Sequence, residues 1–273
     1  MKTLQELTLL DRFLFAETME DQETYEALLR IILGDEELKL LTYDQTEKEF
    51  RTAPWLRSIR VDVYSMDADT IYNVEMQKSW RDDLIKRSRY YQALIDSTLL
   101  APGDISFNAI KNTTIIMIMP FDLFGKDRFV YTFEETCKED NTVCLEDGAR
   151  RIFINTHGKN FKDVSPEFIA LMKFIEYNEG KETADDSPNL NKIRRRVAQV
   201  KASEKVGVKY MNKWEEEDII RQEGRKEGRE EGQEEERLIS VRNIMKNLKM
   251  TAEQAMEAIG IPESEYSKYM PLL

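Results

Sequence analysis

The sequence predicts an α/β protein, in which helices flank a mixed β-sheet and a charged helical tail follows at the C-terminus. Three observations lead to this fold class. Apolar and polar residues alternate through most of residues 59–77, and residues 113–119 form a continuous apolar run rich in β-branched side chains. Segments with helical spacing of apolar residues separate these strand patterns, and nearly everything after Tyr177 is charged and helix-prone. The 273 residues, 41% of them hydrophobic, suffice for one sizeable domain with appendages.

Residues 21–34 form the first expected helix. One helical stripe collects five apolar side chains: Tyr25, Leu28, Leu29, Ile32 and Leu33. Gly34 follows them, and glycine readily adopts the left-handed conformation that closes a helix. The pattern therefore predicts an amphipathic helix that ends at Gly34.

An antiparallel hairpin is expected next. Apolar and polar residues alternate over 59–64 and again over 71–77, which is the period of half-buried strands. Between them the acidic, small and polar residues of SMDADT favour a turn. In the simplest hairpin, positions whose numbers sum to 137 lie opposite each other, so that Asp62 faces Glu75.

Asp62, Glu75 and Gln77 would share one face of this hairpin, which we expect to be exposed. Opposed carboxylates repel each other unless positive charge lies between them, and a divalent cation meets that need. Val74 and Met76 would point the other way, into a core. The alternative is an ordinary solvent-facing hairpin in which nearby arginines neutralise the acids. The pattern itself leaves both interpretations open.

Helices and strands alternate after the hairpin. Residues 81–100 predict a helix whose free side carries four bases: Arg81, Lys86, Arg87 and Arg89. The run TTIIMIMP predicts a central strand, because such a run suits a strand that is covered on both faces. Two further strands are expected in RFVYTFEE and RRIFIN. SPEFIALMKFIEY predicts a helix with Ser165 as N-cap and Pro166 at the first helical position.

The tail begins with a polar linker, NEGKETADDSPN. We therefore expect a globular domain at 1–180, a linker and basic helix at 181–213, and a glycine-spaced charged helix with a short helical pair at 214–273. Gly224, Gly228 and Gly232 lie on one helix face, and each costs roughly 1 kcal/mol relative to alanine. Such a helix needs a packing partner.

The terminal helical pair resembles a helix-turn-helix in outline. Thr251 and Gln254 form a capping-box pair, and Gly260 and Pro262 separate two short helices. Residues 251–273 hold four glutamates and one lysine, however, whereas a DNA-reading unit should be basic. We therefore favour packing or self-association for this pair.

The net charge of −12 is unevenly distributed. Residues 1–50 hold 13 acids against 5 bases, residues 192–213 hold 1 acid against 8 bases, and residues 215–236 hold 11 acids against 4 bases. Residues 51–100, which include Asp62, Glu75 and Gln77, hold 7 acids against 8 bases, so the middle of the chain can present a basic surface to phosphates despite the acidic total.

Several classes of site and protein are disfavoured. With His157 as the single histidine, a histidine-based triad or a multi-histidine metal site is nearly excluded. We expect His157 in a turn, and we expect Cys137 and Cys144 to be free, buried thiols, because their spacing fits neither zinc binding nor a disulfide-rich domain. No stretch approaches the ~18 apolar residues of a membrane span and no signal peptide is evident, which favours a cytoplasmic protein.

Most of the chain resembles the Rpn family of recombination-promoting nucleases and putative transposases, part of the PD-(D/E)XK nuclease superfamily. The residues that carry this resemblance are LRSIRVDVYSMDADTIYNVEMQ, KRSRYYQALID, MPFDLFGKDRFVYTFEETC, LEDGARRIFINT and the glycine-spaced charged tail. The superfamily motif, an acid on one strand and Glu-X-Lys on the next, corresponds to Asp62 and then Glu75, Met76 and Gln77. Gln77 departs from the pattern, which has lysine there.

The resemblance implies a metal-dependent DNA endonuclease with a PD-(D/E)XK-like mixed sheet. Asp62, Glu75 and the backbone carbonyl of Met76 would hold Mg²⁺ or Mn²⁺, which prefer oxygen ligands. Gln77 can orient the attacking water, but it cannot supply the positive charge of a lysine. Either another base substitutes for that lysine or the enzyme is slow.

Further residues are candidates for the site and for DNA. Arg87 would be the substitute base or a clamp on the DNA backbone, because its helix directly follows the Glu-X-Gln strand; a solvated arginine is the alternative. The superfamily often adds an acid from the first helix, and Glu17 or Glu26 would serve. We expect Arg194–Arg196 to bind DNA, unless this basic run pairs with the acidic run that follows it.

The C-terminal helices are expected to form a homo-oligomer. The main alternative to a nuclease is a nuclease-fold module that is catalytically weak or inactive and binds DNA or a protein partner. A purely structural scaffold could describe residues 190–273, but it leaves the shared face of Asp62, Glu75 and Gln77 unexplained.

Overall fold

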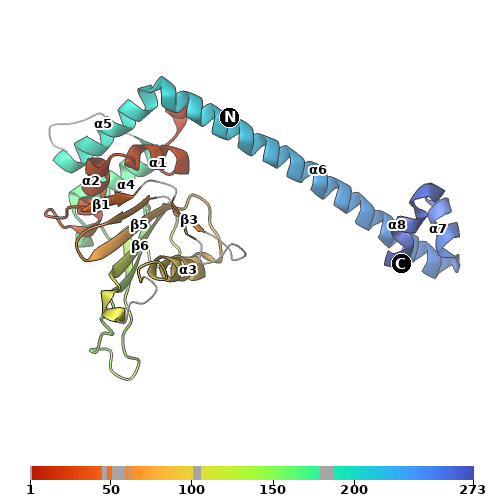
Figure 1. Ribbon diagram of the computed structural model, residues 1–273, viewed down its shortest axis with the longest axis horizontal. Coiled ribbons are helices and arrows are strands. Elements are labelled where there is room, and N and C mark those ends of the chain that lie inside the picture. Colours follow the sequence, from red (N-terminus) through yellow and green to blue (C-terminus); the bar gives the residue numbers. More distant parts are fainter. Residues whose placement is uncertain (1, 45–47, 51–58, 62, 101–105, 179–186) are drawn as a thin grey trace. The chain divides into compact units, whose positions relative to one another are not determined.

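A computed structural model describes residues 2–44, 48–50, 59–61, 63–100, 106–178 and 187–273. It contains two compact units, Met1–Gly207 and Val208–Leu273 (Figure 1). The helices are α1 (Arg12–Met19), α2 (Gln22–Leu33), α3 (Leu84–Asp96), α4 (Pro166–Tyr177), α5 (Pro188–Ala202), α6 (Glu204–Leu248), α7 (Ala252–Ala258) and α8 (Tyr266–Tyr269). The strands are β1 (Thr42–Asp44), β2 (Lys48–Phe50), β3 (Ile59–Val61), β4 (Val63–Met66), β5 (Thr70–Met76), β6 (Asn112–Met119), β7 (Val130–Phe133) and β8 (Ala149–Asn155).

The expected mixed sheet is present in the first unit. Within the described residues it has six strands in the order β1-β4-β5-β6-β8-β7, and β2 and β3 form a separate antiparallel pair. Strands β5, β6 and β8 run parallel to one another, whereas β1, β4 and β7 pair antiparallel to their neighbours. The apolar run in β6 is buried from Thr113 to Met119, as expected for a central strand.

The hairpin has the predicted register. Val63 pairs with Val74 and Met66 pairs with Ile71, so facing positions sum to 137 throughout the described pairing. The turn is closed by the Asp67 carboxylate, which accepts hydrogen bonds from the backbone nitrogens of two residues in the turn. The single strand expected over residues 59–64 is divided, because β3 pairs with β2 in the second sheet. Asp62 lies outside the described residues.

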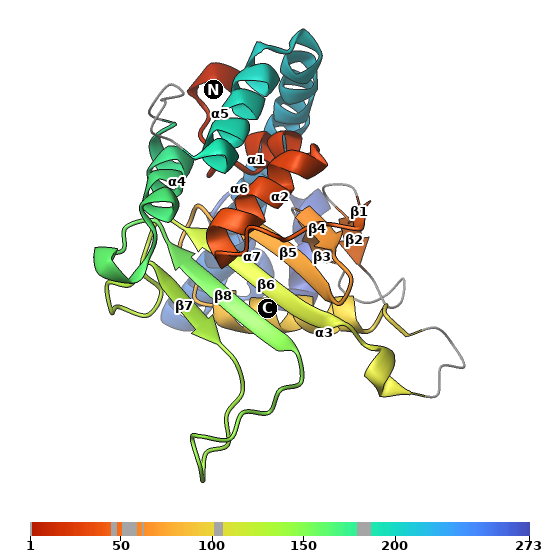
Figure 2. The same cartoon turned by 90° about the vertical axis from the view of Figure 1, so that its left-hand side faces the viewer.

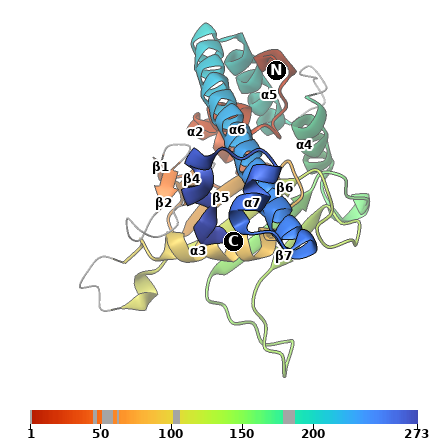
Figure 3. The same cartoon turned by 90° about the vertical axis from the view of Figure 1, so that its right-hand side faces the viewer.

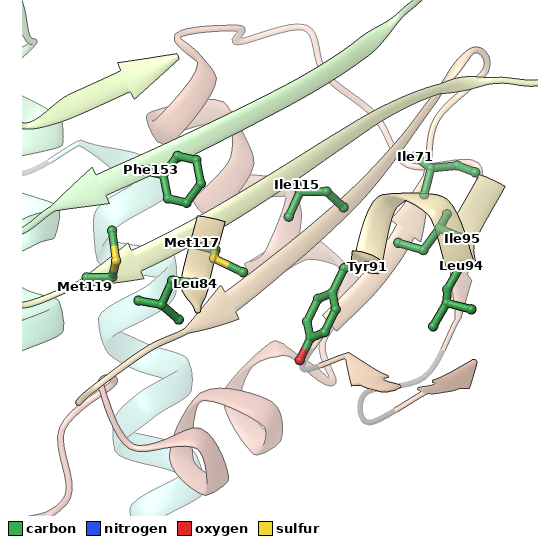
Figure 4. Packing of buried hydrophobic residues seen from close by; sticks show 9 residues of the cluster. All are labelled: Ile71, Leu84, Tyr91, Leu94, Ile95, Ile115, Met117, Met119 and Phe153. Carbon is green, nitrogen blue, oxygen red and sulfur yellow. The ribbon is translucent and has the colours of Figure 1, made fainter. Parts of the chain in front are cut away.

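Helix α3 covers one face of the sheet, and α1, α2, α4 and α5 lie on the other (Figures 1 and 2). Figure 4 shows the core on the α3 face, which contains Ile71, Leu84, Tyr91, Leu94, Ile95, Ile115, Met117, Met119 and Phe153. Each of these side chains stabilises the fold by roughly 1.5–3 kcal/mol when fully buried. Because Ile71 faces α3 and strand side chains alternate, Asn73 and Glu75 also face α3. Val74 and Met76 are buried on the opposite face, as predicted.

The basic segment after the linker folds as α5 and packs mainly against α2. Ser187 caps α5 by accepting a hydrogen bond from the Leu190 nitrogen at 3.1 Å. The buried stripe of α5 has helical spacing: Leu190, Ile193, Val197 and Val200. Helix α2 ends at Gly34 with φ of 69°, as expected. The first compact unit includes this basic helix.

The second unit contains most of α6, together with α7 and α8 (Figure 3). A small core joins the end of α6 to the terminal helices: Val241, Ala255, Met256, Ile261 and Tyr269. The capping box of Thr251 and Gln254 is present, as predicted. In the same unit, residues 221–230 of α6 are exposed.

The cysteines are free but less buried than expected. Cys144 is exposed and Cys137 is half-buried, and both lie in the connection between β7 and β8. His157 lies in the turn after β8, as expected, with its Nε2 atom 2.5 Å from the Glu176 carboxylate. None of the described helices is long and apolar enough to cross a membrane.

Candidate active site

Glu75 is a carboxylate inside the protein. Its exposed fraction is 4%, so the expectation that it lies on an exposed strand face is wrong. The reason is α3, which covers the face of β5 that carries Glu75. A buried carboxylate is expensive unless a positive charge, a metal ion or hydrogen-bond donors compensate it. Its low exposure therefore requires a compensating group close by.

Gln77 and Arg87 meet beside Glu75. The backbone nitrogen of Gln77 donates to the carbonyl oxygen of Ile118 at 2.9 Å, which extends the β5–β6 pairing beyond Met76. The Gln77 side-chain oxygen accepts a long hydrogen bond, 3.4 Å, from Arg87. This contact places the Arg87 guanidinium next to the Glu-X-Gln strand, where its helix was expected to lie.

Tyr91 orients Arg87. The Nε atom of Arg87 donates to the Tyr91 hydroxyl at 2.6 Å, and its guanidinium carbon lies 5.0 Å from the centre of the Tyr91 ring. Burial raises the pKa of Tyr91, and the negative charge of Glu75 raises it further, whereas Arg87 acts to lower it. Tyr91 is therefore a protonated phenol near neutral pH, and the charges of Glu75 and Arg87 both act on its hydroxyl.

Asn73 is a second buried polar group on the same strand face. Its side chain is fully buried, and neither amide atom has a hydrogen-bond partner among the described residues. A buried polar group without a partner costs roughly 1–3 kcal/mol. Asn73 therefore needs a partner that the described residues do not provide.

The two acids considered on the N-terminal helices differ in their surroundings. Glu26 of α2 accepts hydrogen bonds from the Leu40 nitrogen and from Gln22, and it pairs with Arg30 at 3.4 Å. These contacts tie the segment after α2 back to the helix, so Glu26 already has a structural task. Glu17 is buried on α1. Both acids therefore stay predictions, and the choice between Glu17 and Glu26 is open.

The side chains around Glu75 include some of the oxygen ligands that Mg²⁺ or Mn²⁺ would require. Within the described residues, no three acidic, cysteine or histidine side chains form a metal-binding group. Asp62, the second expected acid, falls outside that set. The buried Glu75 carboxylate and the Asn73 amide, which has no hydrogen-bond partner among the described residues, are nevertheless oxygen-bearing groups on one face of β5. Such a donor set fits Mg²⁺ or Mn²⁺ and the waters that these ions retain.

The basic helix presents fewer arginines to solvent than its sequence suggests. The Arg194 guanidinium lies 5.3 Å from the centre of the Phe174 ring, and Arg196 donates to the backbone carbonyl of Glu17 at 3.4 Å. Arg195 is exposed. Binding of DNA by this segment stays a prediction, and Arg195 is the exposed one of its three consecutive arginines.

Sequence reasoning did not single out Asn73 or Tyr91. Asn73 precedes Glu75 by two positions, so the period of the strand was sufficient to place it on the same face. Tyr91 follows Arg87 by four positions, the spacing at which helical side chains meet. The helical pattern already placed Tyr91 on the apolar side of its helix, whereas the burial of Asn73 depends on how α3 packs against the sheet.

One comparison with known proteins identifies a relationship. A family model described as PD-(D/E)XK nuclease family transposase matches residues 11–223, which include the hairpin, α3 and the whole main sheet. No curated protein matches the sequence.

Proposed function

Because the chain belongs to the PD-(D/E)XK nuclease family of transposases, we propose that it is a metal-dependent DNA endonuclease of the recombination-promoting, transposase-associated type. The observation that carries this proposal is the buried Glu75 carboxylate, followed by Gln77 in contact with Arg87. A strand with a purely structural role would not need a buried acid beside a hydrogen-bonded amide and guanidinium.

The proposed metal ligands are Asp62, Glu75 and the backbone carbonyl of Met76. When bound, Mg²⁺ or Mn²⁺ would lower the pKa of a water molecule and neutralise charge on the scissile phosphate. Glu75 would hold the cation on the side of β5 that faces α3. Glu17 or Glu26 would add a further acid.

Gln77 and Arg87 would divide the work of the missing lysine. The Gln77 amide would hold the attacking water by hydrogen bonds, while the Arg87 guanidinium would supply the positive charge. Tyr91 would keep Arg87 in place through its hydroxyl and its ring. With Gln77 holding the water and Arg87 supplying the charge, the site would remain functional although glutamine stands where the superfamily has lysine.

The substrate and partners follow from the same proposal. DNA would be held by Arg87 near the cation and by Arg195, assisted by Arg194 and Arg196, on α5. The C-terminal helices would join chains into a homo-oligomer, because the three glycines of α6 weaken an isolated helix and permit close approach. A DNA substrate is consistent with a cytoplasmic protein.

A specific observation keeps a second function in view. Gln77 has no charge, and the hydrogen bond from Arg87 to it is long. If Arg87 does not replace the lysine, the chain is a catalytically weak or inactive nuclease-fold module that binds DNA or a protein.

Purified protein incubated with supercoiled plasmid, with Mg²⁺ or with EDTA, separates the two functions. The nuclease proposal predicts nicked plasmid with Mg²⁺ alone, and no nicking by Glu75→Gln or Asp62→Asn. Glu134→Gln is the matched control, because Glu134 is an exposed acid paired with Arg150 outside the site. Plasmid binding without nicking by the unmodified protein would favour the binding module.

A further inference from the structure

The most informative group that the proposed mechanism does not use is Asn73. It lies on β5 two residues before Glu75, with its side chain on the same face. Across the sheet its parallel partner is Ile115, and the cluster around it is apolar. An asparagine at this position does not help to pack the core.

The hydrogen-bonding of Asn73 is incomplete in the described protein. Both its carbonyl oxygen and its amide nitrogen are buried without a partner among the described residues. Asn155, another buried asparagine at the end of β8, makes two hydrogen bonds: its amide donates to the Arg128 carbonyl, and its oxygen accepts from the His157 nitrogen. Since Asn155 is buried and has its hydrogen bonds, burial alone does not explain why the Asn73 amide has none among the described residues.

We propose that Asn73 is a positioning residue of the cation site, where its amide holds a water molecule that links it to Glu75 and to the bound divalent cation. This inference rests on the proposed metal-dependent function. A neutral amide suits the task, because it can donate to the Glu75 carboxylate and accept from a water molecule without adding a second negative charge. Partners in such outer positions fix the orientation of the ligands themselves.

Leucine has nearly the shape of asparagine but no polar atoms, so Asn73→Leu isolates the role of the amide. Binding of Mn²⁺ is measured by calorimetry, and the melting temperature is measured with and without Mn²⁺. We expect the Mn²⁺ affinity to fall by about 10- to 100-fold. We also expect the metal-free melting temperature to stay the same or rise, because an unsatisfied buried amide is removed. Unchanged Mn²⁺ affinity would overturn the proposal.

Asn73→Asp tests the same role if the leucine variant does not fold. A carboxylate beside Glu75 should lower the melting temperature of the metal-free protein and enlarge the increase that Mn²⁺ produces. An increase no larger than that of the unmodified protein contradicts the proposal. Asn155→Leu is the matched control: it should lower the melting temperature because two hydrogen bonds are lost, and leave Mn²⁺ affinity unchanged.

Glu75→Gln separates this inference from the proposed function. If Glu75→Gln leaves Mn²⁺ binding intact, the cation site itself is misplaced and the proposed function fails. If Glu75→Gln abolishes binding and Asn73→Leu has no effect, the site stands and the role of Asn73 alone is refuted.

Discussion

Replacement of Arg87 by methionine removes the positive charge while keeping the apolar stem of the side chain. The variant loses the 2.6 Å hydrogen bond to Tyr91, the longer one to Gln77 and the packing of the guanidinium against the Tyr91 ring. For a half-buried arginine we expect these losses to lower the free energy of unfolding by about 1–2 kcal/mol. The fold should therefore survive.

The effect on catalysis should be larger than the effect on stability. Loss of a charge-assisted contact worth about 1.5–3 kcal/mol in the transition state slows a reaction roughly 10- to 150-fold. The assay is the single-turnover rate of plasmid nicking with saturating Mg²⁺. Circular dichroism checks that the variant is folded.

A second substitution tests the reason for the effect. Gln77→Lys places an ammonium group where the superfamily has its lysine, so Arg87→Met combined with Gln77→Lys should recover most of the lost rate. A nicking rate for Arg87→Met within twofold of the unmodified protein would refute the role of Arg87. Slow nicking by the double variant would mean that a positive charge at position 77 cannot replace the charge of Arg87.

Three further predictions concern other parts of the chain. Arg195→Gln should reduce the salt dependence of DNA binding, measured by fluorescence anisotropy, by a slope of about 0.9, and an unchanged slope would mean that α5 does not contact phosphates. Truncation after Met211 should reduce the molar mass measured by light scattering, whereas an unchanged oligomeric state would exclude association through the C-terminal helices. Burial acts to raise the pKa of Asp122, but hydrogen bonds, among them one from Tyr131, outweigh it and hold the pKa below its ordinary value. The ionised Asp122 carboxylate therefore stabilises the fold above its ordinary pKa, and this stabilisation is lost as the pH falls through the lower pKa of the folded protein. Asp122→Asn should lower the melting temperature at pH 7 and weaken the decline of the melting temperature in acid. Parallel plots of melting temperature against pH for the two proteins would contradict this.

Local patterns in the sequence were sufficient for the hairpin and the central strand. The alternation over 71–77 and the turn residues before it determined a register in which Val63 pairs with Val74, as the structure has it. The continuous apolar run in β6 predicted a strand covered on both faces, because only such a strand buries every side chain. In both cases the information lies within a few consecutive residues, where strand period and turn chemistry act.

Burial by distant segments was not predictable in the same way. Glu75 was expected on an exposed face because its strand face carries polar residues. A strand pattern shows which residues share a face, but it does not show which helix covers that face. Arg194–Arg196 were all expected to bind DNA, yet Arg194 packs on Phe174. Cys144 was expected to be buried because free cysteines usually are, whereas it is exposed in the connection between β7 and β8. Each of these outcomes depends on packing between elements that are far apart in the sequence.

The central claim is that a divalent cation binds beside Glu75. Its most direct test is anomalous diffraction at the manganese absorption edge from crystals grown with Mn²⁺. The account predicts a peak within bonding distance of the Glu75 carboxylate and the Met76 carbonyl oxygen, and no such peak in crystals of Glu75→Gln. A manganese peak elsewhere in the molecule, with none at Glu75, would contradict it.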